Sequence, residues 1–174
     1  MLKEFNVGKM HVRCFETRKE MGDVSAKDAA AAIKKVIAEK GECNAIFAAA
    51  PSQNDFLASL AADTSIDWTK VNAYHMDEYI GLPSDAPQGF GNFLKEAIFG
   101  KVPFKSVNYL GGGADDIDAE IKRYEDLLKT NKPDMVFMGI GENGHIAFND
   151  PHVAHFDDDC LVKKVELDAK CRQQ

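Results

Sequence analysis

Several features are scarce or missing in this sequence of 174 residues, and each absence narrows the class of protein. Cys14, Cys43, Cys160 and Cys171 lie far apart and form no C-x-x-C pair. The sequence therefore supports neither a zinc site nor a disulfide framework. No apolar run approaches the roughly 20 residues that cross a bilayer, and the N-terminus lacks the apolar segment of a secretory signal. We expect a cytoplasmic protein with reduced thiols and no membrane partner.

A surplus of basic residues is missing as well. The chain has 21 Lys and Arg against 28 Asp and Glu, which gives a net charge of -7. A protein that binds the phosphate backbone of nucleic acid needs a basic face, so nucleic acid is not an expected partner. The overall charge does not exclude a small anionic substrate, because one local pocket can hold it.

The sequence contains an alternation of short apolar runs and amphipathic stretches. We predict strands at residues 11–15, 45–49, 71–76, 107–110, 135–138 and 161–167. Helices are predicted from a cap at Ser25 to a stop at Gly41, and at residues 54–62, 93–99 and 116–129. Strands that alternate with helices predict a single α/β domain over residues 1–174, with a largely parallel sheet covered on both faces.

Polar residues gather where three of these predicted strands end. They are Ser52-Gln53-Asn54, Asp77-Glu78 and the stretch from Asn143 to Asp150. In open α/β sheets the ligand binds beyond the carboxyl ends of the strands. We therefore expect the three groups to converge on one site.

The stretch Gly139-Ile140-Gly141-Glu142-Asn143-Gly144 matches the dinucleotide fingerprint G-x-G-x-x-G. The fingerprint needs a helix that starts within the glycines, but the residues after them have no apolar stripe, and Pro151 would break such a helix. Without the helix, its N-terminal N–H groups cannot hold a pyrophosphate. The glycines instead predict a sharp turn that brings backbone N–H groups close to a ligand, or a plain tight turn.

The residues with chemistry each have an ordinary structural interpretation too. His145 with Asp150 suits proton transfer near neutral pH, although a lone loop histidine is more often structural. Of Asp77 and Glu78, adjacent acids after a strand, at most one faces a pocket, and both could simply be solvated. Ser52 at the head of a helix fits either a phosphate site or an N-cap. Three consecutive aspartates at 157–159 fit a surface turn better than a metal site.

Two motifs in order, "MDEYIGLP" at 76–83 and "GIGENGHIAFNDP" at 139–151, resemble the glucosamine-6-phosphate deaminase (isomerase) family. The helix "AKDAAAAIKKVIAEKGE" and the strand and loop after it are similar as well, so the resemblance covers nearly the whole chain. The continuation "HIAFN" distinguishes this branch from the related 6-phosphogluconolactonases. The resemblance implies a Rossmann-like three-layer sandwich that binds no nucleotide and needs neither metal nor cofactor.

The resemblance also implies the reaction and the roles of single residues. The family converts glucosamine 6-phosphate, an amino-sugar phosphate, to fructose 6-phosphate and ammonia by aldose–ketose isomerisation. Asp77 matches the general base between C2 and C1, His145 matches the residue that assists ring opening, and Asp150 matches its paired acid. Asn143 matches an orienting residue, and the remaining matches are substrate contacts: Ser52 at the phosphate, the backbone at Gly139 and Gly141 along the sugar, and Glu78.

Some segments depart from the family pattern. The phosphate loop reads "AAAPSQND", and Pro51 supplies no N–H donor there. The loop "DAPQGF" also differs, which leaves the preferred sugar open. The family's phosphate-binding lysine lies in a C-terminal part that this chain does not reach, so we expect a truncated form of the family domain.

Two other functions remain open, and so does the assembly. The first is an enzyme for another sugar phosphate, such as galactosamine 6-phosphate. The second is a non-catalytic regulator that binds a sugar phosphate, although Asp77, His145 and Asp150 are all retained. Only some members of the family form homo-oligomers, so the oligomeric state is open as well.

Overall fold

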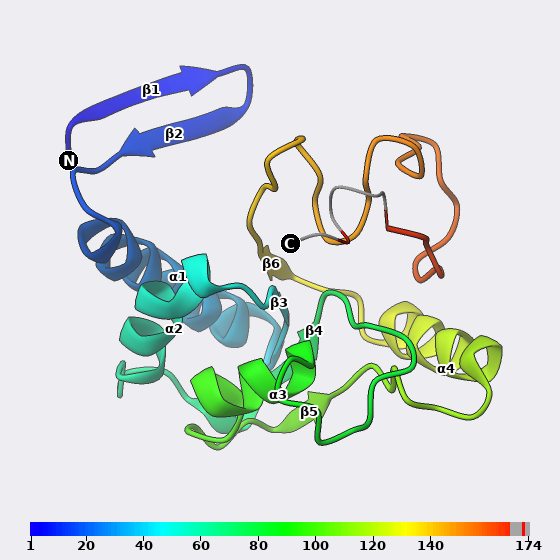
Figure 1. The fold of residues 1–174 in the computed structure, drawn as a ribbon. Helices are drawn as coiled ribbons and strands as arrows, with labels where there is room; N and C mark the ends of the chain where they lie inside the picture. The colour runs from blue at the N-terminus through cyan, green and yellow to red at the C-terminus, as the bar shows by residue number, and fades with distance from the viewer. Residues whose placement is uncertain (168–171, 173–174) are drawn as a thin grey trace.

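A four-stranded sheet forms the centre of the molecule (Figure 1). Its strands are β3 (Cys43–Phe47), β4 (Val71–His75), β5 (Ser106–Asn108) and β6 (Met135–Phe137). They run in the order β5-β4-β3-β6, and every neighbouring pair is parallel. The computed structural model describes residues 1–167 and 172. The predicted parallel α/β sheet is confirmed, with each of these strands within a few residues of its expected position.

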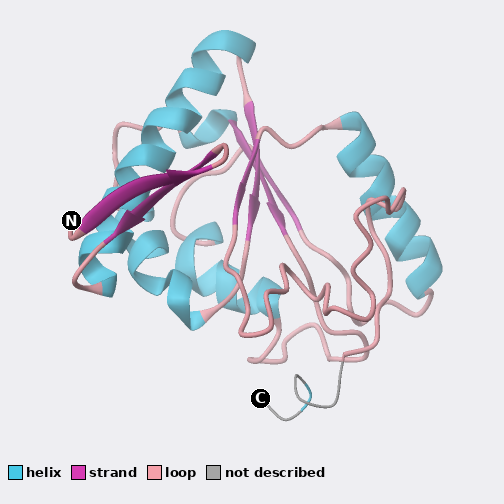
Figure 2. Cartoon of the chain, turned by 90° about the horizontal axis from the view of Figure 1, so that it is seen from above, coloured by secondary structure: helices cyan, strands magenta, loops and turns pink. Residues whose placement is uncertain are grey.

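Helices cover the two faces of the sheet unequally (Figure 2). One face packs against α1 (Arg18–Lys40), α2 (Asn54–Ala61), α3 (Phe90–Leu94) and the π-helical turn η3 (Lys95–Phe99). The other face carries α4 (Ile117–Thr130), and the 3₁₀ turns η1 (Pro51–Gln53) and η2 (Trp68–Lys70) lie in the connections. The three-layer sandwich is confirmed. In the described part of the chain, no helix has the length and apolar character that a membrane span requires.

Phe47 lies at the centre of the core between the sheet and the first group of helices. Its ring is fully buried and contacts Phe99 and Phe137, with ring centroids 5.4 Å and 5.1 Å away. Because β3 and β4 are covered on both faces, their residues are almost all buried. This packing fixes the two central strands, from whose ends the site loops leave.

Helix α1 begins eight residues earlier than predicted, with its N-cap at Thr17 and not at Ser25. The Thr17 hydroxyl accepts the N–H of Glu20 at 3.1 Å, whereas Ser25 lies inside the helix. Gly22 is kept within the helix because α2 packs there. A Cβ on Gly22 would lie 2.8 Å from the backbone nitrogen of Phe56. This close contact places the start of α2, and with it the predicted phosphate loop.

The first predicted strand forms, but outside the main sheet. Residues Met10–Cys14 make β2, which pairs antiparallel with β1 (Lys3–Val7) in a separate hairpin. Gly8 in its turn has a φ of 58°, in the left-handed region that a tight hairpin turn needs. The hairpin lies apart from the sheet in Figure 1.

The strand predicted at residues 161–167 is wrong, because this segment is irregular and pairs with no strand. Its half-buried residues Val162 and Val165 instead line a cavity of about 830 Å³ over the α4 face of the sheet. Val136 of β6 lines the same cavity and is 44% exposed. The alternating apolar residues of this segment thus contact apolar surface without pairing with a strand.

Candidate functional site

Three loops leave the carboxyl edge of the sheet side by side. Phe47, near the end of β3, pairs with His75 of β4 on one side and with Phe137 of β6 on the other. The chain moves from β3 through β4 to β5, then crosses back to place β6 on the opposite side of β3. Such a reversal of strand order opens a crevice at the carboxyl edge, where ligands of this fold class bind. The predicted site residues follow β3, β4 and β6.

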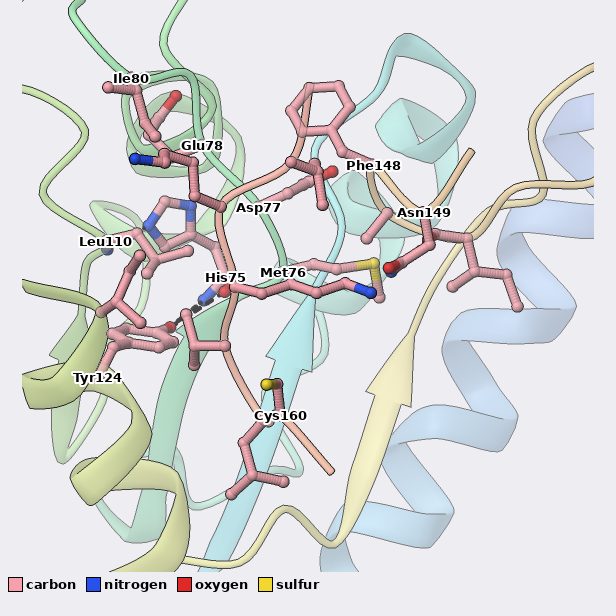
Figure 3. A pocket seen from close by; sticks show the side chains of 18 of the residues that line it. His75, Met76, Asp77, Glu78, Ile80, Leu110, Tyr124, Phe148, Asn149 and Cys160 are labelled. Atoms are coloured by element: carbon pink, nitrogen blue, oxygen red, sulfur yellow. Dashed lines mark hydrogen bonds between the residues drawn. The ribbon is translucent and has the colours of Figure 1, made fainter. Parts of the chain in front are cut away.

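Asp77 follows β4 and faces the large cavity (Figure 3). Within the described residues, no group donates a hydrogen bond to its carboxyl group. Burial, and after it the neighbouring charge of Glu78, raises the pKa of Asp77 to about 7. A carboxyl group with this pKa can both take up and release a proton near neutral pH.

Glu78 occupies the same cavity wall, but its carboxylate oxygens are bound by backbone. Oε1 accepts the N–H of Tyr79 at 2.9 Å and that of Phe90 at 3.1 Å, and Oε2 accepts the N–H of Gly91 at 2.9 Å. The last two donors open helix α3. This geometry favours a structural role for the Glu78 carboxylate over the direct substrate contact expected from sequence.

His145, Asn143 and Asp150 form one hydrogen-bonded network in the loop after β6. The Nδ1 atom of His145 lies 2.7 Å from Oδ1 of Asn143 and 3.3 Å from Oδ1 of Asp150. Nδ2 of Asn143 donates to Asp150 Oδ1 at 3.0 Å, and Asp150 is buried. Because both acceptors face Nδ1, that nitrogen carries the proton and Nε2 keeps a lone pair. The network thus orients an imidazole that can act as a base.

Two glycines of the G-x-G-x-x-G stretch shape the chain around this histidine. A Cβ on Gly141 would lie 2.2 Å from Cε1 and Nε2 of the His145 ring, so the imidazole fits only against a glycine. Gly144 has a φ of 87°, which the turn before His145 requires. Gly139 is less constrained, because a Cβ there would meet only Nε2 of Gln53 at 3.6 Å. No helix follows the glycines, as predicted.

Ser52 lies in η1, directly before α2, and is exposed. It does not cap α2, whose N-cap position is Gln53 and has no side-chain hydrogen bond. Gln53 is also the neighbour of Gly139, so the loops after β3 and β6 lie close to each other. The cavity lining includes Asp77 and Glu78 but neither Ser52 nor His145.

His75, which the sequence does not single out, anchors the end of β4. Its Nε2 accepts the N–H of Leu110 at 2.6 Å, and burial lowers its pKa to about 4, so the ring is neutral. The hydroxyl of Tyr124 in α4 accepts the His75 N–H at 3.1 Å (Figure 3). These bonds fix the backbone two residues before Asp77.

An aromatic cluster of Tyr79, Phe90 and Phe148 was also missed. The three rings lie within 4.9 to 5.5 Å of one another, centroid to centroid. They join the loop after β4, the start of α3 and the loop after β6. The only sequence signal was the position of each aromatic residue close to a polar site residue or a glycine.

Comparison with known proteins shows where this chain has relatives. The family model for glucosamine-6-phosphate isomerases/6-phosphogluconolactonase matches residues 16–165. A glucosamine-6-phosphate deaminase of Exiguobacterium sp. is 46% identical over 90 residues, which cover 52% of this chain and 35% of that protein. One from Bacillus cytotoxicus is 32% identical over 142 residues, covering 82% and 52%. This chain spans about half the length of these curated relatives or less.

The solved structures that this chain resembles belong to the same kinds of protein as its relatives in sequence. A structure of a monomeric glucosamine-6-phosphate deaminase matches with a TM-score of 0.79 and 28% identity, over 91% of this chain and 66% of that one. The 6-phosphogluconolactonase of Thermotoga maritima matches in fold, with a TM-score of 0.65 and 21% identity over 72% and 58%. The sequence match over residues 16–165 and the shared fold lead to one conclusion: the chain belongs to the glucosamine-6-phosphate isomerase/6-phosphogluconolactonase family.

Proposed function

We propose that this chain acts on an amino-sugar phosphate and converts glucosamine 6-phosphate to fructose 6-phosphate and ammonia. The observation that carries the proposal is the Asp77 carboxyl group, which is desolvated, accepts no hydrogen bond from the described residues and has a pKa of about 7. Aldose–ketose isomerisation needs one base that reaches two neighbouring carbons, and a single carboxylate does this well. The names of the relatives point to the same reaction.

Ring opening comes first and is assigned to His145. Its Nε2 lone pair takes the proton of the anomeric hydroxyl, and the imidazolium returns a proton to the ring oxygen as the C1–O5 bond breaks. Asp150 and Asn143 hold Nδ1 through the network after β6, so the ring keeps the tautomer that leaves Nε2 basic. The charge of Asp150 also stabilises the transient imidazolium.

Proton transfer follows on the open-chain sugar. Asp77 removes the proton from C2, which gives an enolamine as O1 takes up a proton. It then returns its proton to C1, which leaves an imine at C2 as the amino group gives up a proton. Water adds to the imine and ammonia leaves, so fructose 6-phosphate remains. Ser52 and the N–H groups before α2 are proposed to hold the phosphate, and the backbone at Gly139 and Gly141 lines the sugar.

An ammonia-release assay over a panel of amino-sugar phosphates tests the proposal. We expect release from glucosamine 6-phosphate, and Asp77→Asn should abolish it because the amide cannot take up a proton. Asp85→Asn is the matched control, since Asp85 is an exposed acid in the loop that follows. Release by Asp77→Asn near the normal rate would refute the role of Asp77. Tight binding without ammonia from any sugar would favour a regulator, and preference for galactosamine 6-phosphate would reassign the substrate.

A further inference from the structure

The Glu78 carboxylate caps a helix to which it does not belong. Helix α3 begins after Gly89, which has no side chain to accept the first N–H groups. Glu78 supplies the acceptor from the loop after β4 and binds the N–H groups of Phe90 and Gly91. An anion at this position satisfies donors that a helix leaves unpaired and interacts favourably with its N-terminal dipole. The loop that carries Asp77 is thereby tied to α3.

Glycines allow three backbone segments to close around this carboxylate. A Cβ on Gly112 would lie 2.0 Å from the carbonyl oxygen of Tyr79 and 2.9 Å from Cγ of Glu78. A Cβ on Gly91 would lie 3.0 Å from the Tyr109 ring and 3.5 Å from Oε2 of Glu78. The segments around residues 78–79, 89–91 and 109–112 therefore meet at Glu78.

The charge of Glu78 has no cationic partner among the described residues, unlike two other acids that line the cavity. Glu120 pairs with Arg123 at 2.6 Å, and Asp158 pairs with Lys163. Backbone N–H groups alone hold the Glu78 carboxylate, so its net negative charge remains next to Asp77.

Other titratable groups line the same cavity from β4, α4 and the last segment. His75 is neutral, and the acids Glu120 and Asp158 have their own cations, so none of them adds an unpaired charge next to Asp77. Burial is the first cause of the raised Asp77 pKa and Glu78 the second. The other titratable groups that line the cavity are His75, Tyr79, Glu120, Tyr124, His155, Asp158, Cys160, Lys163 and Lys164.

We propose that Glu78 is a positioning residue, which anchors Asp77 to the start of α3 and strengthens proton binding at Asp77 through its fixed charge. Glu78 thus acts on the substrate only through Asp77. The consequence for the reaction rests on the proposed function. The anchoring and the effect on the Asp77 proton do not, because both can be measured without a substrate.

Carboxyl NMR titration of the whole chain tests the charge effect, with Asp77→Asn to assign the signal. In Glu78→Gln the midpoint of the Asp77 titration should fall by roughly one pH unit, because a like charge has been removed. Glu120→Gln is the matched control: Glu120 also lines the cavity and accepts a backbone N–H, from Gly111 at 2.7 Å, but is paired with Arg123. We expect a much smaller shift there. Equal midpoints in the wild type and Glu78→Gln would overturn the charge effect.

Hydrogen exchange tests the anchor separately. At least one of the amides of Phe90 and Gly91 should exchange at least tenfold faster in Glu78→Gln, because the NH₂ group that replaces one carboxylate oxygen donates and cannot accept. Glu78→Asp, which keeps the charge but shortens the side chain, should lose this protection and still titrate Asp77 as the wild type does. This second variant decides the matter if Glu78→Gln does not fold. Unchanged protection in Glu78→Asp would refute the anchor. If ammonia release is absent while these shifts occur, the proposed function fails and the positioning role stands.

Discussion

The loops after β4 and β6 each place an acid at the site, and the two acids have opposite surroundings. Asp150 is 1% exposed and lies in a network with Asn143 and His145. Asp77 accepts no hydrogen bond from the described residues, and desolvation raises its pKa to about 7. Asp150 is held by hydrogen bonds, as its proposed role in orienting His145 requires, and Asp77 has a pKa near neutral, as its proposed role in proton transfer requires. The pair shows that environment, not residue type, separates the two roles.

The two loops also differ in how they are held. The β6 loop is held by short-range contacts, such as the bond from Gly141 N–H to the His145 carbonyl at 2.9 Å. The β4 loop depends on distant partners: Glu78 on the start of α3, and His75 on Leu110. Damage to the β6 loop should therefore stay local, whereas damage to the β4 loop should reach several elements.

The largest effect is expected from Gly141→Ala, which breaks the β6 loop from within. The new Cβ would lie 2.2 Å from the His145 ring, so the imidazole must move. A displacement of about 1 Å costs roughly a hundredfold in rate, and we expect a loss of this size in kcat for ammonia release. Gly139→Ala, with only Gln53 in ordinary contact, should lose far less. Equal losses in the two variants would argue against the close fit of His145 on Gly141.

The second prediction concerns the β4 loop and gives stability and activity opposite pH dependences. The folded chain holds the Asp77 proton up to about pH 7, whereas unfolded Asp releases it near 3.8. Folding therefore binds a proton between these values. The stabilisation is full below pH 4 and is lost as the pH rises toward 7, on the order of a few kcal/mol in total.

Denaturant unfolding between pH 4 and 8 measures this difference directly. The free energy of unfolding of the wild type, relative to Asp77→Asn, should fall across the range. Over the same range kcat/KM should rise about tenfold per pH unit and level off near pH 7, since only the ionised base accepts the C2 proton. A difference in unfolding free energy that does not change with pH would show that burial does not hold the proton on Asp77.

The helices and strands were predicted correctly from the sequence where the local pattern and the tertiary packing agree. The apolar runs of β3 and β4 are buried on both faces, and Gly41 ends α1 in the left-handed conformation with a φ of 87°. The start of α1 was misplaced because Gly22, a weak helix former, is retained for its contact with α2. The segment at residues 161–167 alternates like a strand, but its apolar side chains line a cavity. Pattern alone does not distinguish these environments.

The sequence predicted which positions lie near the candidate site, but not which groups their side chains contact. That polar residues after β3, β4 and β6 share one edge follows from parallel strands. Two of the partners of Glu78 are N–H groups 12 and 13 residues away, and no spacing rule connects them to Glu78. Position 141 requires glycine because the ring of His145, four residues later in the chain, folds back over it. Both contacts depend on tertiary geometry that the sequence pattern does not contain.

The smallest effect is expected where the two loops touch. Phe148 of the β6 loop packs against Tyr79 of the β4 loop, with ring centroids 5.1 Å apart. Phe148→Leu should lower the free energy of unfolding by about 1 kcal/mol, because an aromatic pair contributes roughly this much beyond its buried area. We expect kcat/KM to fall only several-fold. Phe156→Leu is the matched control, because Phe156 lies in the same segment and is fully exposed.

A double-mutant cycle with Tyr79→Leu then decides whether the loops are coupled. If the ring contact links them, the double variant should be more stable than the sum of the single losses predicts, by about 0.5 to 1.5 kcal/mol. The same cycle on kcat/KM shows whether the contact also matters for the reaction. Additive effects in both measurements would mean that the Asp77 and His145 loops are positioned independently. The aromatic cluster would then only fill space between two sites that are each held by their own contacts.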